Sequence, residues 1–147
     1  MSDRRFNCMR CGHAWGQPAR TIICPACGSR SFHTEPDRPE RRYVGIVPEN
    51  DPMEQEVYIA IGTAFLMLPW RLDVRNHSPT GLSWGYFGSG PSQCALAILC
   101  DAVGVERAQP LYMDFKFERI GQLDRLHGWE MTHAEVVAWV EMKEAQQ

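Results

Sequence analysis

The chain has 147 residues, of which 44% are hydrophobic and 22% charged, with a net charge of −3. These values suit one globular domain, or a small module plus one compact domain, and no apolar run reaches the roughly 18 residues of a membrane-spanning helix. Asp3, Arg4, Arg5 and an early cysteine pair exclude a signal peptide, so we expect a reducing cytoplasm, where cysteines hold metal more often than they form disulfides.

The charge is divided unevenly along the chain. Residues 1–42 contain eight Arg and four acidic residues, a net +4, whereas residues 43–147 contain seven Lys or Arg and fourteen acidic residues, a net −7. A basic module of this kind indicates contact with nucleic acid. The alternative is a two-part protein whose halves attract each other, and the charge alone does not choose between them.

Two C-x₂-C pairs lie in the first 35 residues, each followed by a glycine and separated by twelve residues. The four cysteines are Cys8, Cys11, Cys24 and Cys27. Each C-x₂-C turn places two sulfurs on one side of a tight loop, and the glycine lets the backbone pass beneath a bound ion. Two such turns close a tetrahedral four-thiolate site. We therefore predict one structural Zn²⁺, on which the folding of this small module depends.

The two cysteine turns resemble those of zinc ribbons, over residues 4–33. The strands expected here are 4–7, 13–16, 21–23 and 31–33. Zinc ribbons contact nucleic acid or protein, and the fold does not choose between these partners. The basic residues that would contact phosphates are Arg4, Arg5, Arg10, Arg20 and Arg30. Trp15 and Phe32 either stack on a base or form the apolar centre of the module.

The predicted organisation is a zinc ribbon at 1–35, a linker at 36–42 and a second domain at 43–147. The linker is polar, and its Pro36 and Pro39 favour an extended backbone. Apolar runs in the second domain predict strands at 43–47, 56–61 and 64–68. Gly62-Thr63 would be the turn of a β-hairpin between the last two strands.

The first predicted helix, residues 92–103, is apolar on all sides and should be buried. Pro91 suits its first turn, Ser89 or Gly90 its N-cap and Gly104 its C-terminal cap. Its two cysteines, Cys94 and Cys100, are interpreted as small core residues.

Two further helices are predicted. The second, residues 110–123, has an apolar face at helical spacing, formed by Met113, Phe117, Ile120 and Leu123. The third begins at Thr132, which forms a capping box with Glu135 and directs Val136, Trp139 and Val140 inward. The second domain is therefore predicted to be α+β, with a small antiparallel sheet followed by about three helices.

Three motifs of the second domain are distinctive. They are Trp84–Pro91 (WGYFGSGP), Tyr112–Glu118 (YMDFKFE) and Trp129–Thr132 (WEMT). They resemble a small domain family of unknown function that is frequent in bacteriophages and other mobile bacterial elements. The resemblance covers about residues 43–141. It implies a fold and a genomic neighbourhood, with the cytoplasm of a bacterial host as the location, but it implies no activity.

The glycine-rich turn is the main candidate for a ligand or partner site. Such a turn before a helix presents backbone N–H groups and a positive dipole end to a phosphate or carboxylate. The candidate residues are Trp84, Gly85, Tyr86, Gly88, Ser89, Gly90 and Ser92, and Ser83 adds a further hydroxyl. The alternative is structural, because glycines allow a tight turn and a close helix–sheet approach. The turn has neither the lysine of a P-loop nor the dinucleotide-binding spacing.

Other catalytic constellations are scarce, and we predict no catalytic residue. The histidines of the second domain, His77, His127 and His133, have no nucleophile beside them in the sequence. Asp114 and Glu118 lie one helical turn apart and either hold a metal ion or form a solvated face with neighbouring basic residues.

Three functional hypotheses follow. The first, which we favour, is a non-enzymatic protein that binds a larger protein or nucleoprotein partner, for example as an inhibitor of host machinery or of a defence system. The second is a sensor or enzyme that binds a small phosphorylated ligand or nucleotide at residues 85–92. The third is a nucleic-acid binder led by the basic ribbon, whose affinity would fall steeply with salt.

Overall fold

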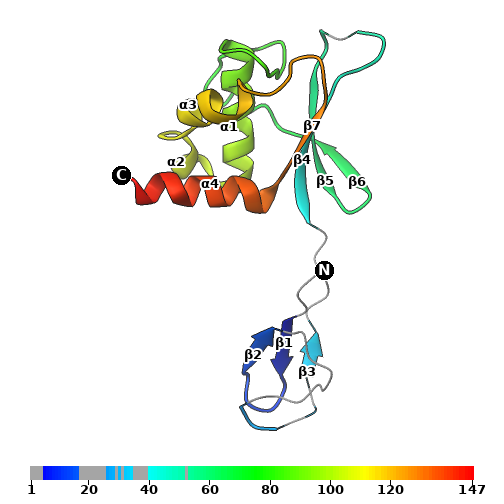
Figure 1. Ribbon diagram of the computed structural model, residues 1–147, viewed down its shortest axis with the longest axis vertical. Helices are drawn as coiled ribbons and strands as arrows, with labels where there is room; N and C mark the ends of the chain where they lie inside the picture. Colours follow the sequence, from blue (N-terminus) through cyan, green and yellow to red (C-terminus); the bar gives the residue numbers. More distant parts are fainter. Residues whose placement is uncertain (1–4, 17–25, 29, 31, 35–39, 52) are drawn as a thin grey trace. The chain divides into compact units, whose positions relative to one another are not determined.

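The computed structural model describes residues 5–16, 26–28, 30, 32–34, 40–51 and 53–147. The chain divides into two compact units, Met1–Pro39 and Glu40–Gln147, and each is described by itself (Figure 1). Within the described residues, no helix has both the length and the apolar character needed to span a membrane.

The first unit contains a three-stranded antiparallel sheet with the order β2-β1-β3. Its strands are β1 (Arg5–Cys8), β2 (Ala14–Gly16) and β3 (Phe32–Thr34). In the register, Phe6 lies opposite Trp15, and Cys8 lies opposite Phe32. These strands begin one residue later than three of the predicted strands. The fourth predicted strand, 21–23, lies outside the described residues.

The second unit is built on a four-stranded antiparallel sheet with the order β6-β5-β4-β7. Its strands are β4 (Arg41–Ile46), β5 (Glu56–Ile61), β6 (Ala64–Met67) and β7 (Trp129–Thr132). The predicted β-hairpin is confirmed, with Ile61 opposite Ala64 across a two-residue turn. Strand β7 is an addition to the predicted sheet, and it pairs with β4.

Strand β4 begins inside the predicted linker. Arg41 donates two hydrogen bonds to the Asp101 carboxylate, of 2.9 Å from Nε and 2.5 Å from Nη2. The hydroxyl of the buried Tyr43 donates a third, of 2.6 Å. Arg42 forms an ion pair with Glu130 on β7. The first two residues of β4, Arg41 and Arg42, are the last two of the predicted linker, and these contacts hold them in the sheet.

Helix α1 (Ser89–Val103) is the centre of the second unit. Every residue from Gly90 to Cys100 is buried, which confirms the prediction of a buried helix. Its N-cap is Gly88 rather than the predicted Ser89 or Gly90, so the helix begins earlier than expected. At its end, Gly104 has a φ of +87°, and its N–H donates to the Cys100 carbonyl, as predicted for a glycine cap.

The helix predicted over residues 110–123 is divided into two short pieces, α3 (Tyr112–Phe115) and the π-helix η1 (Lys116–Ile120). A further short helix, α2 (Val105–Ala108), precedes them. Met113 and Phe117 are exposed, whereas Phe115 and Ile120 are fully buried. The predicted inward face was therefore wrong at Met113 and Phe117. The buried residues of this stretch are instead Leu111, Tyr112, Phe115, Lys116 and Ile120, and the wider π-turn of η1 places Ile120, five residues after Phe115, on the same inward face.

Helix α4 (His133–Ala145) begins with the predicted capping box. The Glu135 N–H donates to Thr132 Oγ1 over 3.0 Å, and the Thr132 N–H donates to Glu135 Oε2 over 2.9 Å. Val136, Trp139 and Val140 are buried, as predicted from their spacing.

The second unit is α+β, as predicted, with its helices on one side of the sheet (Figure 1). The core between these two layers includes Tyr43 and Ile59 from the sheet and Leu96 from α1. Cys94 and Cys100 are buried in the same core, which confirms their predicted structural role.

Candidate functional site

The first cysteine pair lies on a tight turn between β1 and β2. The Cys8 N–H donates to the His13 carbonyl over 2.9 Å, and the Gly12 N–H donates to the Cys8 carbonyl over 3.0 Å. Gly12 has a φ of +74°, and Gly28, after the second pair, has a φ of +73°. Both glycines therefore adopt the left-handed conformation that side chains disfavour, in line with the role predicted for them.

Three of the four predicted ligands come together. The Sγ atoms of Cys8, Cys11 and Cys27 all lie within 4.8 Å of one another, and those of Cys8 and Cys27 are 3.6 Å apart. Cys24 lies outside the described residues. Cys8 is buried, whereas Cys11 and Cys27 are exposed. Three sulfurs at this separation can bind one metal ion.

The electrostatic surroundings of Cys8 favour its thiolate. The backbone N–H groups of Cys11 and Arg10 donate to its sulfur, the latter over 3.4 Å, and they lower the pKa of the Cys8 thiol to about 6. The thiolate is the form of cysteine that binds metal, and sulfur ligands suit soft or borderline ions such as zinc. The donor set therefore fits a metal site.

The candidate nucleic-acid contacts of the first unit are only partly described. Arg10 and Arg30 are exposed. Arg5 belongs to β1, but only its backbone is described. Arg4 and Arg20 lie outside the described residues. The stacking or core role of Trp15 and Phe32 likewise stays a prediction, because only their backbone pairing is described.

In the second unit, the glycine-rich turn encloses Trp84. The Trp84 indole is fully buried, and its Nε1–H donates to the carbonyl oxygens of Asp124 and His127, over 3.0 and 3.1 Å. The ring also packs edge-on against Trp129, with 5.6 Å between the ring centroids. Trp84 therefore joins the turn to the 124–129 segment, and its ring has no free face for a base.

Two glycines of the turn permit close packing. Gly85 has a φ of +84°, and a Cβ atom there would lie 2.6 Å from the Cα of Arg125. A Cβ atom on Gly90 would lie 1.8 Å from the Ser83 Oγ. No side chain fits at either position without a shift of its neighbours. These contacts favour the structural interpretation of the glycines.

Hydrogen-bond donors of the turn are used within the protein. The Gly85 N–H donates to the Ile120 carbonyl, and the Ser92 N–H and Oγ both donate to the Gly88 carbonyl. Ser83 Oγ and the Tyr86 hydroxyl share a hydrogen bond of 2.8 Å. These groups therefore already have hydrogen-bond partners within the protein. The Ser89 side chain, in contrast, is exposed.

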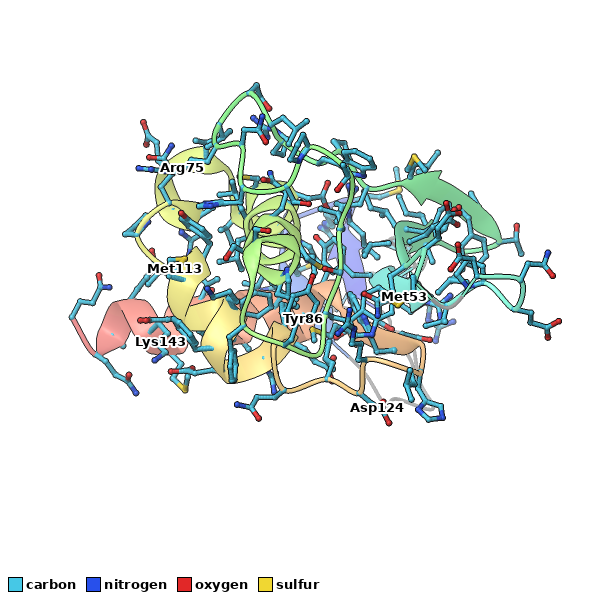
Figure 2. The ribbon with its side chains drawn as sticks, turned by 90° about the horizontal axis from the view of Figure 1, so that it is seen from above. Met53, Arg75, Tyr86, Met113, Asp124 and Lys143 are labelled. Atoms are coloured by element: carbon cyan, nitrogen blue, oxygen red, sulfur yellow. The ribbon has the colours of Figure 1, made fainter. Side chains whose placement is uncertain are left out.

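A polar groove of about 330 Å³ lies beside this turn. Its lining includes Glu54, Glu56, Trp70, Ser83, Tyr86 and Arg125. The Arg125 guanidinium lies 4.6 Å from the centre of the Tyr86 ring. Figure 2 shows two lining residues, Tyr86 on the loop before α1 and Met53 on the loop before β5. The lining comes from several separate segments of the chain, so no local sequence motif predicts the groove.

The glycine-rich turn, nearly all of the groove lining and most of the helical residues lie in the part of the chain that matches a known family. Residues 54–142, more than half of the chain, match a family of unknown function, DUF6166. The chain belongs to this family. No curated protein and no solved structure matches the chain. The DUF6166 region includes α1, β5, β6 and β7, but it excludes both the cysteine pairs and β4.

The histidines of the second unit all have partners. His77 Nε2 shares a hydrogen bond of 2.9 Å with the Tyr112 hydroxyl, and burial, with the nearby charge of Arg75, lowers the pKa of His77. His127 Nδ1 lies 2.7 Å from Asp124 Oδ2. His133 Nε2 lies 3.2 Å from a backbone carbonyl. None of the three forms a pair with a serine, threonine or cysteine in the described residues.

The carboxylate pair proposed from the sequence does not form a metal site in the described residues. Glu118 accepts a hydrogen bond of 2.9 Å from the Trp139 indole and forms an ion pair with Lys143. Asp114 is exposed. Glu118 therefore joins η1 to α4 rather than forming a solvated face with the neighbouring Lys116, which is buried.

Proposed function

We propose that the chain is a non-enzymatic binding protein, in which a zinc ribbon and the DUF6166 domain present surfaces to a larger protein or nucleoprotein partner. The observation that carries the proposal is the convergence of the sulfurs of Cys8, Cys11 and Cys27. In this proposal Cys24 is the fourth ligand, and the site holds one structural Zn²⁺. Four thiolates leave no open coordination position for catalysis, so the metal shapes a surface.

The second unit supports a binding role more than a catalytic one. In its described residues, the histidines are paired with hydrogen-bond partners, and the donors of the glycine-rich turn described above are used internally. The groove beside the turn contains Ser83, but Ser83 bonds to Tyr86 rather than to a histidine. A nucleophile beside a base, which covalent catalysis needs, is absent from the described part of the unit.

The resemblance to domains of bacteriophages and mobile elements adds a setting to the proposal. The protein would act in the cytoplasm of a bacterial host and would inhibit or modulate host machinery, including a defence system. The exposed Arg10 and Arg30 would contribute if the partner contains nucleic acid.

The zinc assignment is tested by metal analysis of the purified chain. We expect one zinc ion per chain, and we expect Cys24→Ser to lose it because three thiolates bind zinc much more weakly than four. Cys100→Ser is the matched control, since Cys100 lies in the core of the second unit, and it should keep its zinc. Zinc-free wild-type protein, or a Cys24→Ser variant with full zinc content, would refute the assignment.

The partner is tested by capture from bacterial lysate, with and without nuclease, with the wild-type chain and both cysteine variants. A protein that is retained in stoichiometric amount after nuclease, and lost with Cys24→Ser alone, would support a contact through the ribbon. Recovery of nucleic acid alone, with steep salt dependence, would make nucleic acid the partner. Equal capture by Cys24→Ser and wild type would move the contact to the second unit.

A further inference from the structure

Strand β6 is an unprotected sheet edge. One side pairs with β5, and no strand pairs with the other side among the described residues. All four residues are exposed, with exposed fractions of 55% for Phe65, 55% for Leu66 and 59% for Met67. Figure 1 shows the β5–β6 hairpin at the end of the sheet opposite β7.

Sheet edges are blunted by short strands, charged side chains, prolines or bulges; β6 is short, at four residues, but it contains no charged side chain and no proline. The sequence from residue 57 to residue 70 contains no charged side chain. An exposed, uncharged and apolar edge strand is a template for pairing with another strand.

The register of the β5–β6 hairpin identifies the free backbone groups. Ile61 and Ala64 flank a two-residue turn, so they form a hydrogen-bonded pair. Two residues further on, the same alternation makes Ile59 and Leu66 such a pair, and the Leu68 N–H donates to the Val57 carbonyl over 3.1 Å. The N–H and C=O groups of the residues between, Phe65 and Met67, therefore point to the free side of β6.

We propose that β6 pairs antiparallel with β6 of a second copy of the chain, about a two-fold axis at Leu66. Phe65 of each copy then forms a hydrogen-bonded pair with Met67 of the other, which uses all four free groups of each strand. Leu66 lies opposite Leu66 in a non-hydrogen-bonded pair, where side chains approach most closely. The two four-stranded sheets become one continuous sheet.

Two features favour a second copy as the occupant. The free groups are symmetric about Leu66, so the strand is complementary to itself. Because β6 carries no charge, the two-fold axis brings no like charges together, and each Phe65 ring meets a Met67 thioether, which is a favourable contact.

The area of the contact sets its strength. At about 30 Å² per interface residue, the residues of 62–70 other than the buried Leu68 supply roughly 240 Å² per copy, against roughly 800 Å² per partner in a standard interface. The dimer is therefore weak and reversible, and it forms as the protein concentration rises. This inference does not depend on the zinc ribbon.

The test uses the full chain with zinc and reductant present, followed by sedimentation velocity over a wide concentration range. The wild type should shift from monomer to dimer as its concentration rises. Leu66→Lys and Leu66→Glu should each remain monomeric, because each places like charges opposite each other at the axis. An equimolar mixture of the two variants should dimerise again, since opposite charges then face each other.

Met113→Lys is the matched control, because Met113 is also an exposed apolar residue but lies on α3, on the helical side of the unit (Figure 1). It should dimerise like the wild type. Restored association in the mixture also shows that both Leu66 variants are folded. A wild type that stays monomeric throughout, Leu66 variants that still dimerise alone, or a mixture that stays monomeric would each overturn the proposal.

Discussion

Gly90, in the first turn of α1, offers the sharpest test of the packing role of the glycine-rich turn. A methyl group at this position would lie 1.8 Å from Ser83 Oγ and 2.8 Å from the Tyr86 hydroxyl oxygen. Both distances are well inside the roughly 3.5 Å of a normal non-bonded contact. Because Gly90 is buried, an alanine there must displace Ser83 or move the turn away from the helix.

The size of the effect follows from two opposing terms. Overpacking of a buried site costs about 1–3 kcal/mol, and alanine recovers up to about 1 kcal/mol because it favours the helix more than glycine does. We therefore expect Gly90→Ala to lower the free energy of unfolding by about 0.5–2 kcal/mol. Ser83→Ala alone removes the hydrogen bond to Tyr86 and should cost about 1 kcal/mol.

The double variant separates a local clash from a general disturbance. In Ser83→Ala/Gly90→Ala the closer of the two clashing oxygens is gone, so the loss of stability should be smaller than the sum of the single losses by about 1 kcal/mol. Urea unfolding followed by far-ultraviolet circular dichroism measures all three variants, because the helices of the second unit dominate that signal. A Gly90→Ala protein as stable as the wild type, or losses that simply add, would refute the reasoning.

Two further predictions concern other contacts of the second unit. Gly85→Ala should cost more than about 2 kcal/mol, because it combines a positive φ with backbone atoms 2.6 Å from the new methyl group. Gly104→Ala, with a similar φ but open space, is the control and should cost about 1 kcal/mol in calorimetry; equal losses would contradict the packing argument. Lys143 holds the pKa of Glu118 below its ordinary 4.5, so this carboxylate stabilises the fold above that pH and loses its contribution as the pH falls through the lowered value. Glu118→Gln should therefore lose less stability on acidification, by less than about 1 kcal/mol because Glu118 is partly exposed, and acid unfolding curves parallel to the wild type would count against this.

Local signals predicted the elements that depend on local chemistry. The β5–β6 hairpin follows from two apolar runs around a two-residue turn, and the start of α4 follows from the Thr132–Glu135 capping box. The buried character of α1 follows from its uniform apolar composition. In each case the local structure of a residue is determined by residues close to it in the sequence.

The misses involve partners that are distant in the sequence. Strand β7 has only four residues and is held in the sheet by its pairing with β4. The start of β4 at Arg41 likewise depends on a distant partner, because Arg41 bonds to Asp101 on α1. The inward face predicted for the second helix was wrong at Met113 and Phe117 because the segment is divided into α3 and the π-helix η1, and a 3.6-residue period does not represent a π-turn. The groove could not be predicted for the same reason, because its lining combines residues that precede α1 in the sequence with Arg125, which follows it.

The position of β4 has a consequence for how the second unit forms during synthesis. β4 lies between β5 and β7 in the sheet. It can pair with β5 early, but its other edge, where Arg42 pairs with Thr132, is completed only after almost the last segment has left the ribosome. Such long-range pairing makes folding slow. The DUF6166 match begins at residue 54, after β4, and a protein cut to that match would hold β7 with no neighbouring strand. We expect gene fragments to yield folded second unit only when they begin before Arg41 and extend through α4.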